Sequence, residues 1–322
     1  MNRKIWIAWE TQRRSLELAN YLGCKLYVFD VSGYLRYPVC ILKTIPLLFF
    51  LKADIIFVQN PSIVLAALAC FCTRITKTRL VVDRHSNFRL NKPQSGSFPI
   101  WLFMRFHYYS LRSADLTIVT NKYIADLVIK SNGKPVILPD KLPEFHNFNQ
   151  VNLRGEINIL YIASFGLDEP VREVIKAFSL LDITNCCLYI TGNYNKRPDY
   201  LPDKIPERVI FTGFIPENDY PAFLMESDLI IVLTKSDHCM LCGCYEAVSV
   251  GKPLITSNKT VLREYFKEAF FVENEPESIG SGIKTVLSDI SGYTQKTLSM
   301  KKDIKQKWQT HYRNLLKNIN SL

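Results

Sequence analysis

The chain has 322 residues, of which 48% are hydrophobic and 22% charged, with a formal net charge of +10. This length supports two domains with separate cores, and the absence of repeats or Gly/Pro-rich tracts excludes collagen-like, solenoid and disordered proteins. The first residues lack the pattern of a secretory signal, and the longest apolar run, 63–72, is about half of the roughly 20 residues that a membrane-spanning helix needs. We therefore expect a cytoplasmic protein, either soluble or attached peripherally to a membrane.

The charge is distributed unevenly along the chain. Residues 1–150 have a net charge of +11, residues 151–300 of −6, and residues 301–322 of +5. A basic first half predicts an anionic partner, such as a phospholipid surface or a phosphate-bearing acceptor, unless the charges only solvate that face. Nucleic acid is not expected, because the sequence has no zinc finger, RNA-recognition motif or Lys/Arg-rich arm.

Short apolar runs rich in β-branched residues alternate with segments of helical apolar spacing, such as 11–22, 170–181 and 221–227. The runs predict strands at 4–8, 25–29, 54–58, 80–82, 116–120, 136–138, 158–162, 187–190, 209–211, 229–233, 253–256 and 270–272. This alternation predicts an α/β protein with two doubly wound, Rossmann-like parallel sheets. The expected domains are 1–150 and 151–300. A basic amphipathic helix, 301–322, is expected to return to the first domain. Ligands should bind in a cleft beyond the carboxyl ends of the strands.

Residues 228–258 have the most specific pattern: an apolar strand, a polar loop, a helix containing Glu246-Ala247, a Gly-Lys-Pro turn and another strand. This pattern resembles the donor-binding half of nucleotide-sugar glycosyltransferases with two Rossmann-like domains, the GT-B architecture. The resemblance is to the group marked by Glu-x7-Glu ahead of Ala-x-x-x-Gly-Lys-Pro. Segments 158–166, 189–193 and 209–216 fit the same resemblance. It implies a hexosyltransferase that uses a nucleotide diphosphate sugar, with residues 1–150 on the acceptor side.

The resemblance also implies which residues bind the donor. The second Glu of the family motif accepts hydrogen bonds from ribose hydroxyls, which assigns this role to Glu246; the alternative is a mere charge in the first turn of the helix. The first Glu is replaced by His238, which either bonds to sugar hydroxyls or is a polar loop residue. Further donor-binding candidates in the matching loops are Ser164, Gly166, Gly213, Phe214, Gly243 and Tyr245.

The loop after the first strand of the second half departs from the family. The usual Arg/Lys-Gly pair is missing, and Ser164-Phe-Gly166 leads through Asp168-Glu169 into a helix. Unbonded N–H groups at such a helix start could hold a diphosphate. In that case we expect Asp168 and Glu169 to face solvent, because they would repel the phosphates. An ordinary capped helix start is the alternative.

In the first half, Asp83-Arg84-His85 forms a polar cluster at the end of a strand. Sugar transfer requires an acceptor hydroxyl to be polarised or deprotonated, and a strand-end Asp or His suits this task. Asp83 and His85 are therefore the catalytic candidates. The alternative is an Asp83–Arg84 salt bridge beside a structural histidine.

The loop after the first strand carries Glu10, Arg13 and Arg14. We expect one of the arginines to reach a phosphate and Glu10 to contact the acceptor, unless all three are solvated charges at a helix start. No metal is expected to assist the transfer, since helix N-termini and basic side chains can neutralise a diphosphate.

The His238-Cys239-x-x-Cys242-x-Cys244 cluster could be imagined as a metal site. Structural zinc sites usually draw ligand pairs from separate turns, whereas these candidates lie within seven residues. We expect packing thiols there and no bound cofactor; the nucleotide sugar is a substrate.

Segments 34–52 and 98–111 mix aromatic, aliphatic and basic residues. This composition suits interfacial helices on an anionic membrane, although such stripes are more often part of a core. A lipid-linked or saccharide acceptor for surface polysaccharide synthesis would fit such a location.

Two rival functions remain. One is a nucleotide-sugar epimerase of the same architecture, which needs no acceptor. The other is a non-catalytic glycosyltransferase-like partner protein, suggested by the missing first Glu and the missing Arg/Lys-Gly pair.

Overall fold

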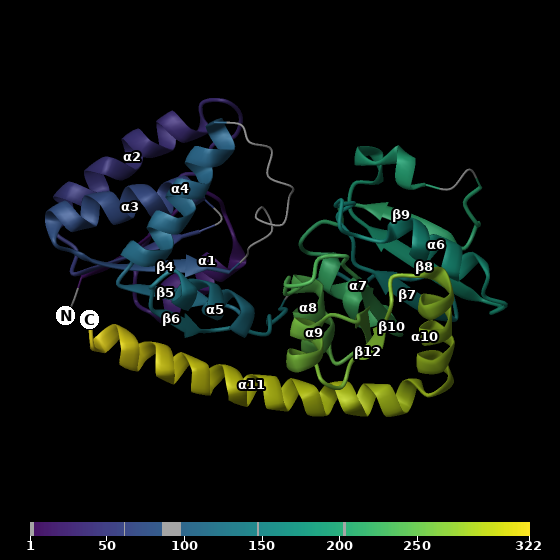
Figure 1. The fold of residues 1–322 in the computed structure, drawn as a ribbon. Helices are drawn as coiled ribbons and strands as arrows, with labels where there is room; N and C mark the ends of the chain where they lie inside the picture. Colours follow the sequence, from purple (N-terminus) through teal and green to yellow (C-terminus); the bar gives the residue numbers. More distant parts are fainter. Residues whose placement is uncertain (1–2, 61, 86–97, 147, 202–203) are drawn as a thin grey trace. The chain divides into compact units, whose positions relative to one another are not determined.

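The computed structural model describes residues 3–60, 62–85, 98–146, 148–201 and 204–322. The chain folds into two compact units: Met1–Asp140 with Trp308–Leu322, and Lys141–Lys307. Each unit contains one six-stranded parallel sheet with helices on its faces (Figure 1). The predicted class, an α/β protein with two doubly wound sheets, is confirmed.

The first unit is built on a sheet in which every neighbouring pair of strands is parallel. Its strands are β1 (Lys4–Ala8), β2 (Lys25–Val28), β3 (Ile55–Gln59), β4 (Arg79–Arg84), β5 (Leu116–Val119) and β6 (Pro135–Ile137). In the spatial order β2-β1-β3-β4-β5-β6, the direction of winding reverses at β1.

Alternate side chains of β1 enter different cores on the two faces of this sheet. Ile5 and Ile7 pack with helices α2 (Arg36–Phe50) and α3 (Ile63–Thr76), beside α4 (Phe98–Ser113). Trp6 and Ala8 face α1 (Arg13–Tyr21) and the last turns of α11 (Ile290–Asn320). Helix α5 (Lys122–Lys130) packs against β5 and β6.

The second unit has the same architecture, with a six-stranded parallel sheet. Its strands are β7 (Ile157–Tyr161), β8 (Cys186–Thr191), β9 (Val209–Gly213), β10 (Leu229–Val232), β11 (Leu254–Ser257) and β12 (Phe270–Val272). The spatial order β12-β11-β10-β7-β8-β9 makes β7 and β10 neighbours, and the winding reverses between them.

Helices cover both faces of the second sheet as well. Helices α6 (Val171–Ser179) and α10 (Pro276–Ser288) pack on one face. The opposite face is covered by α7 (Tyr220–Glu226), α8 (Cys242–Val250), α9 (Thr260–Tyr265) and the part of α11 around Met300 and Ile304. Both faces of β7 and β10 are therefore buried, which explains why β10 is a continuous apolar run and why Asn158 is the one polar residue of β7.

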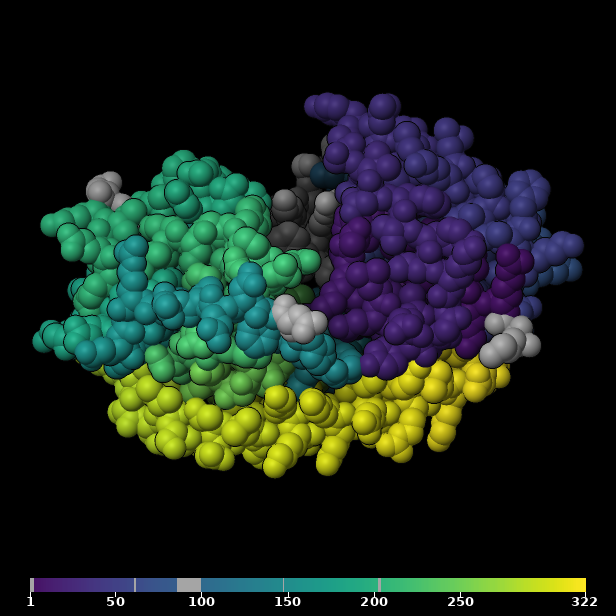
Figure 2. All heavy atoms as spheres, turned by 180° about the vertical axis from the view of Figure 1, so that it is seen from behind, coloured from purple at the N-terminus to yellow at the C-terminus, as the bar shows by residue number. Residues whose placement is uncertain are grey.

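The last turns of α11 belong to the first unit, where they lie along the N-terminal part of the chain (Figure 2). The Trp308 Nε1–H donates to the Pro139 carbonyl oxygen at 3.1 Å, and the Trp308 ring stacks on Tyr312 with centroids 5.1 Å apart. Leu315 and Ile319 complete this buried stripe, whereas Ile304, from the same predicted apolar side, packs in the second unit.

Candidate functional site

The carboxyl ends of β7 and β10 are the place where an open sheet of this topology binds ligands. Helix α8 begins directly against these strands. Its second residue is Gly243, and the lack of a side chain there allows the close approach. A Cβ at Gly243 would lie 3.0 Å from Cγ1 of Val232 and 3.2 Å from Cδ1 of Ile162. The glycine thereby brings the amino end of α8 onto the point where the winding reverses.

Glu246 lies on α8 and is half-buried. The Tyr220 hydroxyl, from α7, donates to Oε2 of Glu246 at 2.6 Å and fixes the direction of the carboxylate. The sequence did not single out Tyr220. Because α8 begins at Cys242, Glu246 lies in the second helical turn, and the first turn contains no acidic residue. The placement of Glu246 in the first turn of the helix, on which the alternative interpretation depended, is therefore wrong.

Three other donor-binding candidates lie at the carboxyl end of β9 or in the loops that follow β9 and β10. His238 is half-buried in the loop after β10. Gly213 ends β9 with a φ of +68°, and its carbonyl oxygen accepts the Gly192 N–H at 2.9 Å. The ring of Phe214 is 72% exposed, with the Lys196 ammonium 5.7 Å from its centroid. An exposed aromatic ring at a strand end suits stacking against a planar ligand.

Tyr245 is a correction to the predicted donor contacts. Its side chain is fully buried in the core of the second unit, where its ring packs against Tyr265 and Phe266 with centroids 5.5 and 5.1 Å away. Helical periodicity explains the difference: adjacent positions on α8 face different directions, so Glu246 and Tyr245 cannot both line one surface.

The loop Ser164–Glu169 after β7 contradicts the expectation that Glu169 faces solvent. The Ser164 N–H lies 2.9 Å from Oε2 of Glu169, the Ser164 hydroxyl donates to Oε1 at 2.9 Å, and the Gly166 N–H donates to Oε2 at 2.9 Å. The carboxylate therefore occupies the group of donors that was predicted to hold a phosphate. Backbone N–H groups attract the chain's own anion as readily as an external one.

Asp168 also points inward rather than to solvent. Its Oδ2 accepts from the Thr234 hydroxyl at 2.7 Å and from the Ser236 hydroxyl at 3.2 Å. Thr234 follows β10, and its N–H donates to the Ser257 hydroxyl oxygen at 2.9 Å. Asp168 thus ties the loop after β7 to the loop after β10.

In the first unit, Asp83 at the end of β4 is fully buried against Arg14 from α1. Arg14 Nη2 and Nε lie 2.9 and 3.0 Å from Oδ1 of Asp83, and Nη1 lies 2.6 Å from Oδ1 of Asp140. The Leu138 carbonyl oxygen accepts a further bond at 2.9 Å. Burial alone would raise the pKa of Asp83, but the Arg14 charge and the bond to His85 outweigh it and lower the pKa to about 2.

These contacts correct two predicted roles. Asp83 is not the proton acceptor, because a carboxylate with such a low pKa and no exposed surface stays ionised and paired. Arg14 is not available to a phosphate, because Asp83, Asp140 and a carbonyl oxygen already occupy its guanidinium. Burial lowers the pKa of Arg14, but the two carboxylates more than reverse this and raise it overall.

His85 is brought to Asp83 but keeps access to solvent. Its Nδ1 lies 3.2 Å from Oδ2 of Asp83, and 15% of its side chain is exposed. Because the ionised Asp83 can only accept, Nδ1 carries the proton in this contact, and Nε2 of the neutral ring is then a hydrogen-bond acceptor. The alternative Asp83–Arg84 salt bridge is wrong: Arg84 donates to the Ser110 hydroxyl at 3.2 Å and lies 3.1 Å from Nδ1 of His107.

The other two charged candidates near β1 are also paired with side chains of the first unit. Glu10 accepts from Arg36 and, at 3.1 Å, from the Gln12 side chain. Arg13 lies 3.7 Å from Glu17 one turn further along α1. Both keep roughly a third of their side-chain surface exposed, and their predicted contacts with acceptor and phosphate stay predictions.

The cysteines near α8 do not gather around a common point. Cys244 is buried against the Thr256 hydroxyl, Cys242 is exposed, and burial raises the pKa of Cys239 to about 11. In the part of the chain that the structure describes, no group of three or more His, Cys, Asp or Glu side chains could hold a metal ion.

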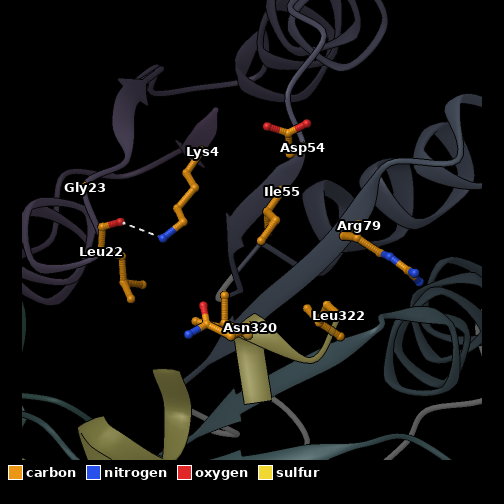
Figure 3. A pocket seen from close by; sticks show the side chains of 9 residues that line it. Lys4, Leu22, Gly23, Asp54, Ile55, Arg79, Asn320 and Leu322 are labelled. Atoms are coloured by element: carbon orange, nitrogen blue, oxygen red, sulfur yellow. Dashed lines mark hydrogen bonds between the residues drawn. The ribbon is translucent and has the colours of Figure 1, made fainter. Parts of the chain in front are cut away.

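A cavity of about 620 Å³ lies at the opposite, amino edge of the first sheet (Figure 3). It is lined by the first residues of β1, β3 and β4, namely Lys4, Ile55 and Arg79, together with the end of α11. The Lys4 ammonium donates to the Leu22 carbonyl oxygen at 3.4 Å across this cavity. Parallel sheets bind ligands at their carboxyl edge, so this cavity is not the candidate site.

Comparison with known proteins agrees with the fold. The sequence profile of the family described as "Glycosyl transferases group 1" matches residues 144–307. The chain belongs to this family and is a glycosyltransferase. A search of the curated proteins found no match.

Solved structures of low sequence identity share the whole fold. HepE of Anabaena in complex with UDP-glucose is 13% identical with a TM-score of 0.73, covering 99% of this chain and 100% of that one. Sucrose-phosphate synthase of Thermosynechococcus elongatus is 13% identical with a TM-score of 0.68 and coverages of 98% and 99%. A putative UDP-N-acetylglucosamine 2-epimerase of Listeria monocytogenes is 12% identical with a TM-score of 0.58 and coverages of 92% and 91%. The architecture is therefore GT-B.

The buried Arg14–Asp83 pair makes a prediction about stability. We expect Asp83→Asn to lower the free energy of unfolding at neutral pH by about 3 kcal/mol, because the fully buried contact with Arg14 loses its charge and Arg14 keeps only the partly exposed pair with Asp140. The pKa of Asp83 is lower in the folded protein than its ordinary value of 3.8, so its stabilisation is complete above about pH 4. It is lost as the pH falls towards 2. Urea unfolding of both proteins across this range should show a flatter pH dependence for the variant. Equal stability at pH 7 would contradict this account.

Proposed function

We propose that the protein transfers a sugar from a nucleotide diphosphate sugar to a lipid-linked saccharide acceptor, at the cytoplasmic face of a membrane. The observation that carries this proposal is the half-buried carboxylate of Glu246, held by Tyr220 on a helix that begins against the carboxyl ends of β7 and β10. A carboxylate with a fixed direction can accept two hydroxyls at once, which matches the two hydroxyls of a ribose.

The surroundings of Glu246 supply the other parts of a donor site. Helix α8 begins after Leu241, whose side chain cannot cap it, so its first N–H groups suit the donor diphosphate. The exposed ring of Phe214 suits stacking against the base, and His238 is assigned to the donor sugar. The complexes of HepE with UDP and with UDP-glucose make UDP the first nucleotide to test.

In the transfer, an acceptor oxygen forms a bond to the anomeric carbon of the sugar while the bond from that carbon to the diphosphate oxygen breaks. The electron pair leaves with the diphosphate, and the acceptor hydroxyl releases its proton. His85 is proposed to receive this proton at Nε2, because Asp83 engages Nδ1 and stabilises the imidazolium that forms. The N–H groups at the start of α8 stabilise the charge that develops on the diphosphate.

The family favours transfer over the two rival functions. An epimerase has the same fold, as the structure from Listeria illustrates, so the fold alone does not separate them. The family match, together with a carboxylate–histidine pair at the end of β4, supports an enzyme that activates an acceptor hydroxyl. A non-catalytic partner protein would need neither the Asp83–His85 pair nor the oriented Glu246.

The layer of α2, α3 and α4 in the first unit supports attachment to an anionic membrane. Its outward side exposes large apolar side chains on every helix, among them Leu42, Phe50, Phe71, Ile75 and Trp101, each at least 55% exposed. Exposed cations lie among them: the guanidinium of Arg74 is 5.9 Å from the ring of Tyr109, and that of Arg105 is 5.6 Å from the ring of Trp101. Apolar side chains with interleaved cations suit the interface of an anionic bilayer. Within the described residues, none of the helices has the length and hydropathy to cross a bilayer.

The ribose assignment predicts the behaviour of Glu246→Gln. We expect its affinity for UDP and for uridine to fall by the same factor, about 10- to 100-fold, because both ligands lose the same charge-assisted hydrogen bonds. Isothermal titration calorimetry measures both affinities. The control is Glu226→Gln, an exposed Glu at the end of α7 near the amino edge of the sheet. Wild-type affinity in Glu246→Gln would refute the ribose contact.

The role of His85 predicts a loss of turnover without a loss of binding. We expect His85→Ala to lower the rate of UDP release from the sugar nucleotide, with membrane lipid extract as the acceptor source, by about 100-fold or more. The affinity for UDP should not change. His146→Ala, which alters a histidine that is 76% exposed, is the control. A normal rate in His85→Ala would exclude it as the proton acceptor.

The membrane proposal predicts sedimentation with vesicles. The protein should bind phosphatidylcholine vesicles that contain phosphatidylglycerol more strongly than pure phosphatidylcholine vesicles, and added salt should weaken the binding. Leu42→Glu with Phe50→Glu should abolish sedimentation, whereas Leu180→Glu, at an equally exposed leucine of the second unit, should not. Equal sedimentation of all variants would argue against attachment through α2–α4.

A further inference from the structure

The loop after β7 forms an anion-binding nest that the chain fills with its own carboxylate. The N–H groups of Ser164 and Gly166 and the Ser164 hydroxyl converge on Glu169, with distances of 2.9 Å for each donor. A carboxylate in such a nest has the same charge and the same acceptor geometry as a phosphate oxygen pair. The donors that bind the Glu169 carboxylate would therefore also suit a phosphate group.

The backbone of this loop is held in the shape that aims its N–H groups together. Phe165, between the two donors, has a φ of +60°, a conformation that is unfavourable for a residue with a side chain. Its ring is 97% buried in the core and packs against Phe211 with centroids 6.3 Å apart, which anchors the strained turn. Gly192 backs the loop closely, because a Cβ there would lie 2.4 Å from the Ala163 carbonyl oxygen. The nest thus persists when its anion leaves.

A second position for the Glu169 carboxylate lies next to the nest. Glu169 also lines a cavity of about 240 Å³ whose wall includes the cations Arg172 and Lys235 and the acidic residues Glu173 and Asp199. The Lys235 ammonium lies 2.9 Å from Glu173, and Arg172 Nη2 donates to the Asp199 carbonyl oxygen at 2.9 Å. A carboxylate that swings out of the nest would therefore enter a cavity that offers two cations, beside the two acidic residues that share its wall.

We propose that Glu169 competes with the diphosphate of the nucleotide for this nest. The nest lies in the loop after β7, the strand that pairs with β10, and the proposed function puts the diphosphate at the start of α8, the helix that follows β10. While the carboxylate is in place it repels a phosphate, so binding requires Glu169 to turn towards Arg172 and Lys235. Its return after transfer favours release of the nucleoside diphosphate. Glu169 thereby lowers the affinity for UDP but not for uridine. This inference rests on the proposed function.

The test compares UDP with uridine by calorimetry on the full chain. Glu169→Gln removes the charge, and we expect it to raise the affinity for UDP about tenfold and to leave the affinity for uridine unchanged. Glu169→Lys should raise the affinity for UDP further, and salt should reduce both gains. Glu226→Gln, which removes one exposed charge from the same unit, should leave both affinities at their wild-type values.

The possible outcomes separate this inference from the proposed function. If the wild-type protein binds neither UDP nor any other common nucleoside diphosphate, the proposed function itself fails; if it prefers another base, the comparison is made with that nucleoside diphosphate and its nucleoside. Suppose instead that the wild-type protein binds both ligands. If the affinity for UDP relative to that for uridine is then the same or lower in Glu169→Gln and Glu169→Lys than in the wild type, only the competition is overturned. Melting curves monitor folding of each variant. If neither variant folds, the carboxylate is a structural brace of the loop, and the competition is likewise overturned.

Discussion

The candidate residues owe their positions to one property of parallel sheets: every strand leaves the sheet at the same edge. In the second unit the winding reverses between β7 and β10, so the loops that follow them diverge to opposite faces and leave an open edge. Gly243 lets α8 begin against this edge. Residues as distant in sequence as Ser164 and Glu246 are thereby brought to one side of the sheet. A side chain at Gly243 would crowd Val232 and Ile162, and either these side chains or the start of α8 would have to shift by a few tenths of an ångström.

Charged groups at both carboxyl edges are compensated first by the chain itself. Arg14 neutralises Asp83 and Asp140 in the first unit, and the N–H groups of a strained turn receive Glu169 in the second. Burial explains the first arrangement, because an unpaired charge in the interior costs several kcal/mol. The consequences for function differ. The Arg14–Asp83 pair keeps Asp83 ionised and so fixes the tautomer of His85. The Glu169 carboxylate, in contrast, lies in a half-buried loop, where a phosphate of the nucleotide is proposed to replace it.

The sequence was sufficient for the fold because buried parallel strands are continuous apolar runs, as in β3 and β10, and such runs are visible without structural information. The pairing of Asp83 was predictable only in part. Neighbouring residues of a strand point to opposite faces, which argues against an Asp83–Arg84 bridge, but no local pattern identifies Arg14 as the partner. The contact of Glu169 escaped prediction because its partners include backbone N–H groups, which every residue except proline carries. Tyr220 was missed because it comes from another helix.

The central claim is that Glu246 holds the ribose of the nucleotide at the edge formed by β7 and β10. A crystal structure of the protein with UDP tests it most directly. The account predicts both ribose hydroxyls within about 3 Å of the Glu246 carboxylate. It also predicts the diphosphate at the start of α8 and Glu169 displaced from Ser164 and Gly166. A nucleotide bound at another edge of either sheet, or a ribose facing away from Glu246, would contradict it.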